Sequence, residues 1–387
     1  MKIVFISNFF NHHQQPLSDA LYRQTEGSYA FIETQRISQA RLALGWGSDS
    51  LPDYVKQSYT DPVSRYECQC IVDQADVVMI GSAPYEWIAN RLRNKKLTFL
   101  YSERLYKQKY EYYKWPVRYI RHFRKYTRHK NLYLLCASAY TAADFAKTGT
   151  FLNRAYKWGY FPPVKHYDNI DRLLESKKPD SLLWVARFLD LKHPEAPLAI
   201  AYRLKKEGYP FTLNIIGGGP LQPQLEKTIA EQDLGDSVHL LGTMKPEEVR
   251  EYMEQSRIFL FTSDRQEGWG AVLNESMNSG CAVVASHAIG SVPFLLEDRK
   301  NGFVYPDGNT DALYEKVKYL LDHKEEQESI GRCACCTMTN EWNAENAAAR
   351  FLRLAEQILA GQVSPDLYPD GICSRAGILK DSWYENV

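Results

Sequence analysis

The chain has 387 residues, of which 44% are apolar and 24% are charged, with 47 basic and 47 acidic side chains. This length and composition predict a globular protein of two domains and exclude a disordered or collagen-like chain. A net charge of zero excludes a uniformly basic nucleic-acid binder. The chain opens directly on KIVFIS and has no run of 18 apolar residues, so we expect a cytoplasmic protein.

The charges are unevenly distributed along the chain. Residues 1–170 contain 24 Lys and Arg against 14 Asp and Glu, a surplus of ten positive charges, and residues 171–387 contain 23 against 33. Such a division indicates that the first half faces an anionic partner. The eight cysteines are scattered, so we expect reduced thiols, and the CACC cluster at 333–336 lacks the neighbouring His or Cys pair of a metal site.

The first half alternates short apolar runs with stretches of helical length. We expect strands at 2–7, 29–34, 76–80, 97–101 and 132–137, and helices near 16–24, 62–74, 85–94, 116–130 and 139–147. This alternation predicts a parallel sheet. A proline-rich, charged stretch follows from Phe161, so we predict a Rossmann-like N-terminal domain at 1–165 and a linker at 166–180.

The second half repeats this rhythm. Apolar runs at 182–186, 212–216, 238–241, 258–261 and 282–285 predict strands covered on both faces, and the last helices are expected at 309–322 and 344–360. We therefore predict a second Rossmann-like domain at 181–362 and a tail at 363–387 that returns to the first domain. The predicted fold class is α/β, with two Rossmann-like domains facing across a cleft and ligands beyond the carboxyl ends of the strands.

Two basic residues follow the first strand of the second half. In WVARFLDLKHPE, Arg187 comes directly after the strand and Lys192 five residues later. This pair suits a phosphate, because the guanidinium offers a planar fork and the ammonium a compact charge. A solvated loop would carry the same residues, so this pair indicates a phosphate site only in combination with the motifs that follow.

A glycine turn follows the second strand of this half. Gly217, Gly218 and Gly219 end the strand at 212–216 and precede Pro220, and glycines there let the backbone approach a ligand. No Gly-Lys-Ser/Thr follows, which excludes a P-loop.

The segment SDRQEGWGAVLNESMNSG places a glutamate on each side of an expected helix start at Gly270. Glu267 precedes the turn and Glu275 lies in the helix, whose first N–H groups, at 270–273, would attract an anion. Eight helical residues span about 12 Å, comparable to a ribose, a diphosphate and a sugar in sequence. The alternative is a helix-start acid followed by a solvated one.

Together these motifs resemble the GT-B glycosyltransferases of family 4, the glycosyl transferases group 1. Arg187, Lys192, the glycine turn, Glu267 and Glu275 match that family's pattern in order, within residues 180–310, whereas the first half resembles it only in its βα alternation. The resemblance implies a GT-B fold and a retaining, metal-independent hexosyltransferase without a cofactor, whose donor is a nucleotide sugar of the UDP or GDP type.

The resemblance also implies a role for each matching residue. Arg187 and Lys192 would stabilise the leaving diphosphate, Glu267 would position the donor sugar, and these three are the candidate catalytic residues. The candidate donor-binding residues are Gly217, Gly218, Gly219, Gly268, Trp269, Gly270, Ala271, Val272 and Glu275, the last for the ribose. The alternatives are a sugar-nucleotide or nucleic-acid binding protein without catalysis and a GT-B sugar phosphorylase. No Gly-x-Gly-x-x-Gly turn follows residues 2–7, which disfavours a dehydrogenase.

The chain departs from the family pattern in places. The loop NFFNHHQQP lacks the glycines often found after the first strand, and Phe294 stands where an acid is common. Candidate acceptor residues are His12, His13 and Glu103, which lie at expected strand ends and which a surface loop would also explain.

Residues 104–130 form a basic, aromatic segment with ten Lys or Arg, one acid and eight aromatic residues. A helical projection from 117 to 129 places the apolar side chains on one side and the basic ones on the other. The candidate membrane-contacting residues are Arg118, Arg121, Arg124, Lys125 and Arg128.

We expect the apolar face of this helix to pack on the sheet. The basic face would be solvated or would dock on anionic lipid, and RNA could use the same charges. We favour the membrane over nucleic acid, because the resemblance implies a glycan or polyprenyl-diphosphate-linked acceptor in polysaccharide assembly. The protein would then be peripheral on the inner face of the cell membrane.

Overall fold

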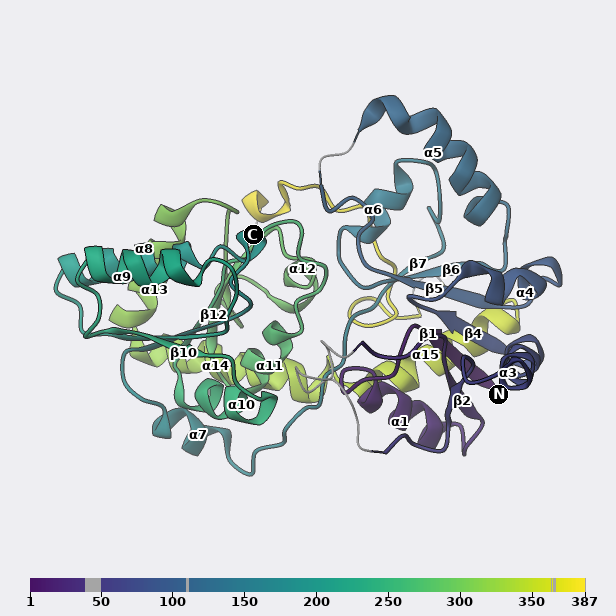
Figure 1. The fold of residues 1–387 in the computed structure, drawn as a ribbon, viewed down its shortest axis with the longest axis horizontal. Coiled ribbons are helices and arrows are strands. Elements are labelled where there is room, and N and C mark those ends of the chain that lie inside the picture. Colours follow the sequence, from purple (N-terminus) through teal and green to yellow (C-terminus); the bar gives the residue numbers. More distant parts are fainter. Residues whose placement is uncertain (39–49, 109–110, 363, 365–366, 387) are drawn as a thin grey trace. The chain divides into compact units, whose positions relative to one another are not determined.

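The computed structural model describes residues 1–38, 50–108, 111–362, 364 and 367–386. The chain separates into two compact units. Unit 1 comprises Met1–Pro163 and Trp342–Lys380, and unit 2 comprises Val164–Glu341 and Asp381–Val387. Each unit is a parallel sheet with helices on both faces (Figure 1). Within the described part of the chain, no helix combines the length and apolar character needed to cross a bilayer.

The sheet of unit 1 has the order β3-β2-β1-β4-β5-β6-β7, and its strands pair in parallel. Its strands are β1 (Ile3–Ser7), β2 (Tyr29–Glu33), β3 (Val55–Gln57), β4 (Val77–Ile80), β5 (Thr98–Ser102), β6 (Leu132–Cys136) and β7 (Ala155–Lys157). Its helices are α1 (Gln15–Gln24), α3 (Pro62–Gln74), α4 (Ala89–Arg93), α5 (Trp115–His122), α6 (Thr141–Ala146) and α15 (Ala344–Leu359). Shorter turns are the 3₁₀ helices η1 (Tyr85–Ile88) and η2 (Tyr112–Lys114) and the π-helix η3 (Phe123–Thr127).

Strand alternation explains the two layers of this core. Val4 and Ile6 cluster with side chains of α3, α4 and α6, whereas Phe99 meets Phe351 of α15 edge-on at 5.0 Å between ring centroids. Because β-strand side chains alternate between faces, one apolar run supplies both layers.

The sheet of unit 2 has the order β10-β9-β8-β11-β12-β13, again parallel. Its strands are β8 (Ser181–Val185), β9 (Thr212–Ile216), β10 (Val238–Gly242), β11 (Ile258–Phe261), β12 (Ala282–Ser286) and β13 (Phe303–Tyr305). Its helices are α7 (Ile170–Ser176), α8 (Glu195–Lys206), α9 (Gln222–Glu231), α10 (Pro246–Gln255), α11 (Val272–Asn278), α12 (Val292–Leu295), α13 (Thr310–Asp322) and α14 (Lys324–Asn340). The 3₁₀ turns are η4 (Asp190–Lys192) and η5 (Trp383–Asn386).

The boundaries of the units differ from the predicted domains. Residues 342–362, assigned by sequence to the second domain, lie in unit 1 because Phe351 packs on Phe99 and Trp158. The predicted linker at 166–180 contains α7, which an Asp171–Arg332 ion pair joins to α14. The tail divides: Cys373 donates its N–H to the Lys157 carbonyl in unit 1, whereas residues 381–387 belong to unit 2.

Candidate functional site

The candidate site lies at the carboxyl edge of the unit 2 sheet. The chain order of the strands reverses between β8 and β11, and ligands in sheets of this type bind beyond the carboxyl ends of the strands at such a point. The loop after β8 carries Arg187 and Lys192, and the loop after β11 carries Glu267. The topology therefore brings the three candidate catalytic residues to one edge.

The glycine turn after β9 fixes the loop that carries Arg187. The Phe188 N–H donates to the Gly218 carbonyl at 2.9 Å. A Cβ on Gly217, whose φ is 144°, would lie 1.9 Å from the Ala186 carbonyl oxygen, and one on Gly219 would lie 2.6 Å from that of Phe188. The close approach at Gly217 and Gly219 is thus between two loops of the protein, and the role of these glycines in donor binding stays a prediction.

Residues at the end of β11 hold the same loop from its other side. The Thr262 hydroxyl donates to the Lys192 carbonyl at 2.7 Å and accepts from Trp184 Nε1 at 2.8 Å. The Asp264 N–H donates to the Leu191 carbonyl at 3.0 Å. Backbone contacts on both sides therefore preorganise the Arg187–Lys192 loop.

Lys192 and Glu267 form an ion pair across the two loops. Lys192 Nζ donates to Glu267 Oε2, and the two side chains are only 15% and 14% exposed. The Ser263 hydroxyl donates to the same carboxylate oxygen at 3.1 Å. The carboxylate orients the ammonium, while the exposed Arg187 side chain adds a second positive charge at this edge.

The turn after Glu267 differs from the prediction. Trp269 is fully buried, its Nε1 donates to Asn274 Oδ1 at 2.8 Å, and its ring lies near Phe294, so its side chain anchors the turn and cannot reach a donor. Helix α11 begins at Val272, not Gly270, and the Leu273 N–H already donates to the Gly270 carbonyl. The helix start therefore offers fewer N–H groups to an anion than the sequence indicated, with Ala271 as the capping residue.

Glu275 lies in the first turn of α11 in a half-buried position. Burial raises the pKa of its carboxyl, and the positive charge of Arg250 opposes this rise. Arg250 also donates to the Glu275 backbone carbonyl at 3.3 Å. A half-buried carboxylate beside a cation could accept hydrogen bonds from ribose hydroxyls, which would replace the contacts with water that burial removes.

The structure adds residues that sequence reasoning missed. His193 has a left-handed φ of 49° and its Nδ1 lies 2.8 Å from Glu195 Oε1, a contact that raises the His193 pKa. Its Nε2 lies 3.7 Å from Asp264 Oδ2. The sequence signal was HPE directly after Lys192, but neither the left-handed turn nor the approach of Asp264 follows from that pattern.

The candidate acceptor residues lie in unit 1. His13 lies between β1 and α1, and burial, followed by the charge of His12, lowers its pKa to about 3. Glu103 follows β5 and accepts from Tyr160 at 2.6 Å and from Lys107 at 2.7 Å. The Glu103 carboxylate is thus engaged inside unit 1, and the His13 side chain is half-buried there.

The basic segment does not pack as predicted. Helix α5 ends at His122, and η3 continues it to Thr127. Its apolar face was expected on the sheet, yet Val117 is 70% exposed and Ile120 52%. The buried side chain of α5 is His122, which fills the position beside Phe145 instead. Arg118, expected at a membrane, pairs with Glu111 at 3.0 Å.

Residues 167–334 match the family described as glycosyl transferases group 1. This part of the chain belongs to that family. The amylovoran biosynthesis glycosyltransferase AmsK of Erwinia amylovora is 30% identical over 186 residues, which cover 47% of this chain and 46% of AmsK. The putative colanic acid biosynthesis glycosyltransferase WcaL of Escherichia coli is 28% identical over 144 residues, covering 36% of this chain and 35% of WcaL. The matches thus span less than half of these relatives.

Solved structures extend the likeness to both units. HepE of Anabaena in complex with UDP superposes with a TM-score of 0.66 at 15% identity, covering 93% of this chain and all of HepE, 100%. The pneumococcal O-GlcNAc transferase GtfA in complex with UDP and GlcNAc gives a TM-score of 0.64 at 12% identity, covering 92% and 99%. The group 1 domain thus forms part of a chain with the α/β GT-B fold.

Proposed function

We propose that the chain is a retaining glycosyltransferase that moves a hexose from a nucleotide sugar to a glycan or lipid-linked acceptor, in the biosynthesis of a surface polysaccharide or glycoconjugate. The observation that carries this proposal is the Lys192–Glu267 ion pair, held by two rigid loops at the edge where the strand order reverses. Amylovoran and colanic acid, named for two relatives, are consistent with a polysaccharide product.

Positive charge at this edge accounts for catalysis. As the bond between the sugar C1 and the diphosphate oxygen breaks, negative charge grows on the diphosphate. Lys192 and Arg187 stabilise that charge, and because the loop is already held, little reorganisation accompanies the reaction. These two cations take the place that a metal ion has in other phosphate sites, so we propose a metal-independent reaction, and chelators should leave the rate unchanged.

Glu267 and Glu275 have different tasks in this proposal. Glu267 orients Lys192 and accepts hydrogen bonds from the hydroxyls of the donor sugar. Glu275 accepts hydrogen bonds from the ribose hydroxyls. In the front-face route that gives retention, the acceptor oxygen attacks C1 on the face that the diphosphate leaves. The departing phosphate oxygen takes the acceptor proton, so neither glutamate acts as a nucleophile.

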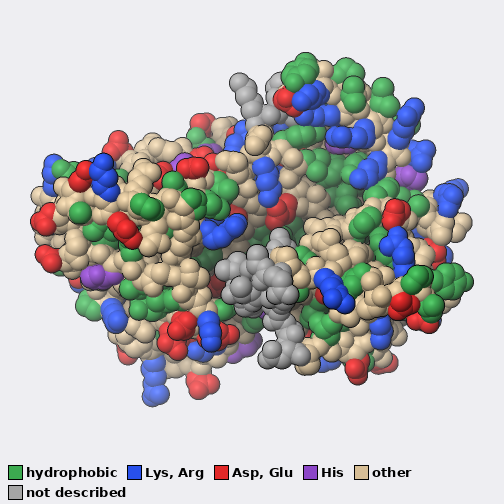
Figure 2. Space-filling model, viewed as in Figure 1, with side chains coloured by type: hydrophobic (Ala, Val, Ile, Leu, Met, Phe, Trp, Pro, Cys, Tyr) green, Lys and Arg blue, Asp and Glu red, His purple; other side chains and the backbone are tan. Residues whose placement is uncertain are grey.

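The acceptor is proposed to be a glycan or a polyprenyl-diphosphate-linked sugar, bound by unit 1. We further propose that the protein attaches peripherally to an anionic membrane on its cytoplasmic face. The basic side chains of α5 and η3, interleaved with exposed apolar ones, support this attachment (Figure 2). At such a surface each basic group contributes about 1 kcal/mol.

A thermal-stability screen against UDP- and GDP-sugars tests the donor proposal. A ligand that binds only the folded state raises the melting temperature, so one nucleotide sugar should raise it more than its nucleoside diphosphate does. Glu275→Ala should abolish that rise. Glu254→Ala, which removes a carboxylate from α10 that pairs with Lys165, is the matched control and should keep it. Equal stabilisation of the wild type and Glu275→Ala would overturn the assignment of Glu275.

A further inference from the structure

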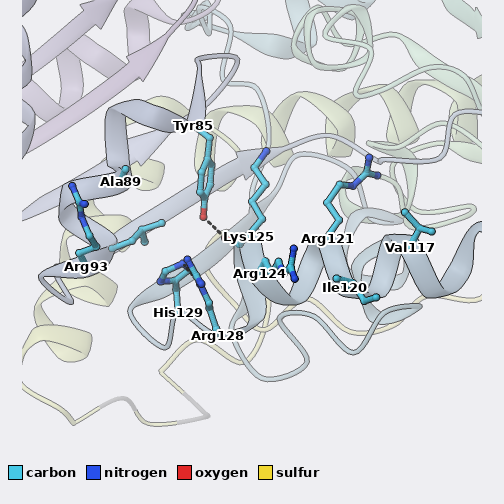
Figure 3. Close-up of a pocket in the computed structure, with 11 residues that line it drawn as sticks. Tyr85, Ala89, Arg93, Val117, Ile120, Arg121, Arg124, Lys125, Arg128 and His129 are labelled. Carbon is cyan, nitrogen blue, oxygen red and sulfur yellow. Dashed lines mark hydrogen bonds between the residues drawn. The ribbon is translucent and has the colours of Figure 1, made fainter.

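A groove lies between α4 and α5 in unit 1. Its volume is about 750 Å³, and α4 contributes Ala89 and Arg93 on one side while α5 and η3 contribute the other (Figure 3). The Tyr85 hydroxyl donates to the Lys125 carbonyl and so ties the π-helical turn to η1. π-Helical turns are frequent at functional sites.

The floor of the groove is aliphatic. Leu92 and Ala89 come from α4, and Val117 and Ile120 from α5. Val117 and Ile120 are 70% and 52% exposed, although a helix of this kind ordinarily buries its apolar face. Aliphatic side chains of this kind bind a hydrocarbon chain well.

The rim of the groove is cationic. Arg121, Arg124, Lys125 and Arg128 come from one side and Arg93 from the other. Among the described residues that line the groove, none is Asp or Glu. Burial and the nearby Arg128 lower the pKa of His129, so this ring is neutral at pH 7 and can accept or donate a hydrogen bond. The rim thus complements one anionic headgroup.

Aromatic side chains continue this surface along α5 and the start of η3. Trp115, Tyr119 and Phe123 are 42%, 41% and 47% exposed, and the rings of Trp115 and Tyr119 stack at 5.2 Å. Aromatic rings of this kind favour the interface between lipid and water. They would lie at headgroup level while the groove took up a chain.

We propose that this groove binds a single membrane lipid with a phosphate headgroup, its hydrocarbon chain on Val117 and Ile120 and its phosphate between Arg124 and Arg128. This inference rests on the membrane attachment proposed above and deepens it. A charged surface attracts any anionic membrane, whereas a groove also predicts saturable binding of one amphiphile. It is independent of sugar transfer, since a lipid binds there without a donor.

The probe is dodecyl phosphate below its micellar concentration, titrated by calorimetry into the full chain without any donor. We expect one site per chain and binding at least tenfold tighter than that of inorganic phosphate or of the uncharged dodecyl maltoside. The double variant Arg124→Ala, Arg128→Ala should weaken the affinity for dodecyl phosphate about 30-fold, because each lost charge weakens it about fivefold. Ile120→Ser should weaken it about tenfold through lost apolar burial.

Matched controls lie elsewhere on unit 1. Lys2→Ala with Lys130→Ala removes the same charge from exposed positions outside the groove, and Val63→Ser removes an apolar side chain that is 65% exposed on α3. Both should bind dodecyl phosphate as the wild type does. All six substituted positions are exposed, so we expect each variant to keep a melting temperature close to that of the wild type.

The proposal is overturned if the control variants weaken binding as much as the groove variants. Binding of anionic vesicles without binding of dodecyl phosphate would overturn the groove and leave the membrane attachment standing. A twelve-nucleotide RNA that binds more tightly than dodecyl phosphate, and that Ile120→Ser binds unchanged, would overturn the lipid in favour of nucleic acid.

Discussion

Gly217→Ala tests whether the glycine turn positions the phosphate-binding loop. The added Cβ would lie 1.9 Å from the Ala186 carbonyl oxygen, and real Cβ contacts stay above 3.0 Å, so the backbones must separate by about 1.1 Å. The shift moves the loop that carries Arg187 and Lys192. Displacements of about 1 Å commonly reduce turnover about 100-fold, and the positive φ of 144° adds about 1 to 3 kcal/mol of strain.

The assay is the affinity for UDP and GDP by calorimetry and, with the donor that the screen identifies, kcat/KM. Gly217→Ala should weaken nucleotide affinity and reduce kcat/KM about 100-fold. The matched control is Gly235→Ala, because a Cβ there meets no atom within 4 Å. The reasoning is refuted if Gly217→Ala folds and keeps kcat/KM within twofold of the Gly235→Ala value.

Three further substitutions probe buried groups. Between pH 7 and 5 the wild type should lose about 2 kcal/mol of stability, because His13 takes up a proton in the unfolded chain but not in the folded one, where its pKa is about 3. His13→Gln should not show this loss in denaturant melts at the two pH values. The control His166→Gln should lose as much stability as the wild type. Lys177→Met should lower the free energy of unfolding by about 3 kcal/mol, because Lys177 Nζ donates to the buried Ser256 and Ser279 carbonyls, both at 2.8 Å; urea midpoints unchanged from the wild type would contradict this. Glu275→Gln should stabilise the ligand-free protein at pH 7. Burial raises the pKa of the Glu275 carboxyl in the folded state, so the wild type loses stability as the pH rises above the pKa of the unfolded chain, and glutamine has no such loss. A melting temperature equal to or below that of the wild type would contradict this prediction.

Much of the donor edge could be predicted because strand ends are strongly marked in the sequence. An apolar run followed by Arg187 places that residue at the carboxyl edge of a parallel sheet, and the strand order then brings Glu267 to it. The comparisons confirm the fold class, and residues 167–334 match the family described as glycosyl transferases group 1. The pairing of Glu267 with Lys192 is a matter of side-chain geometry and did not follow from spacing.

Other features depend on packing that the sequence does not display. Trp269 stands between Gly268 and Gly270 just after Glu267, a pattern typical of a ligand loop, yet its side chain is buried and donates to Asn274. The projection of α5 separated apolar from basic side chains, but it carried no information about which apolar face the sheet would cover. His122 is the buried side chain of α5, whereas Ile120 is exposed and lines the groove.

The central claim is that Lys192 and Arg187 stabilise a leaving nucleoside diphosphate. Its most direct test is single-turnover release of the nucleoside diphosphate from the donor that stabilises the protein, measured in the wild type and in Lys192→Ala at saturating donor. Removal of one such group should raise the barrier by about 3 to 4 kcal/mol and slow release about 10²- to 10³-fold. Release at the wild-type rate from Lys192→Ala would contradict the account.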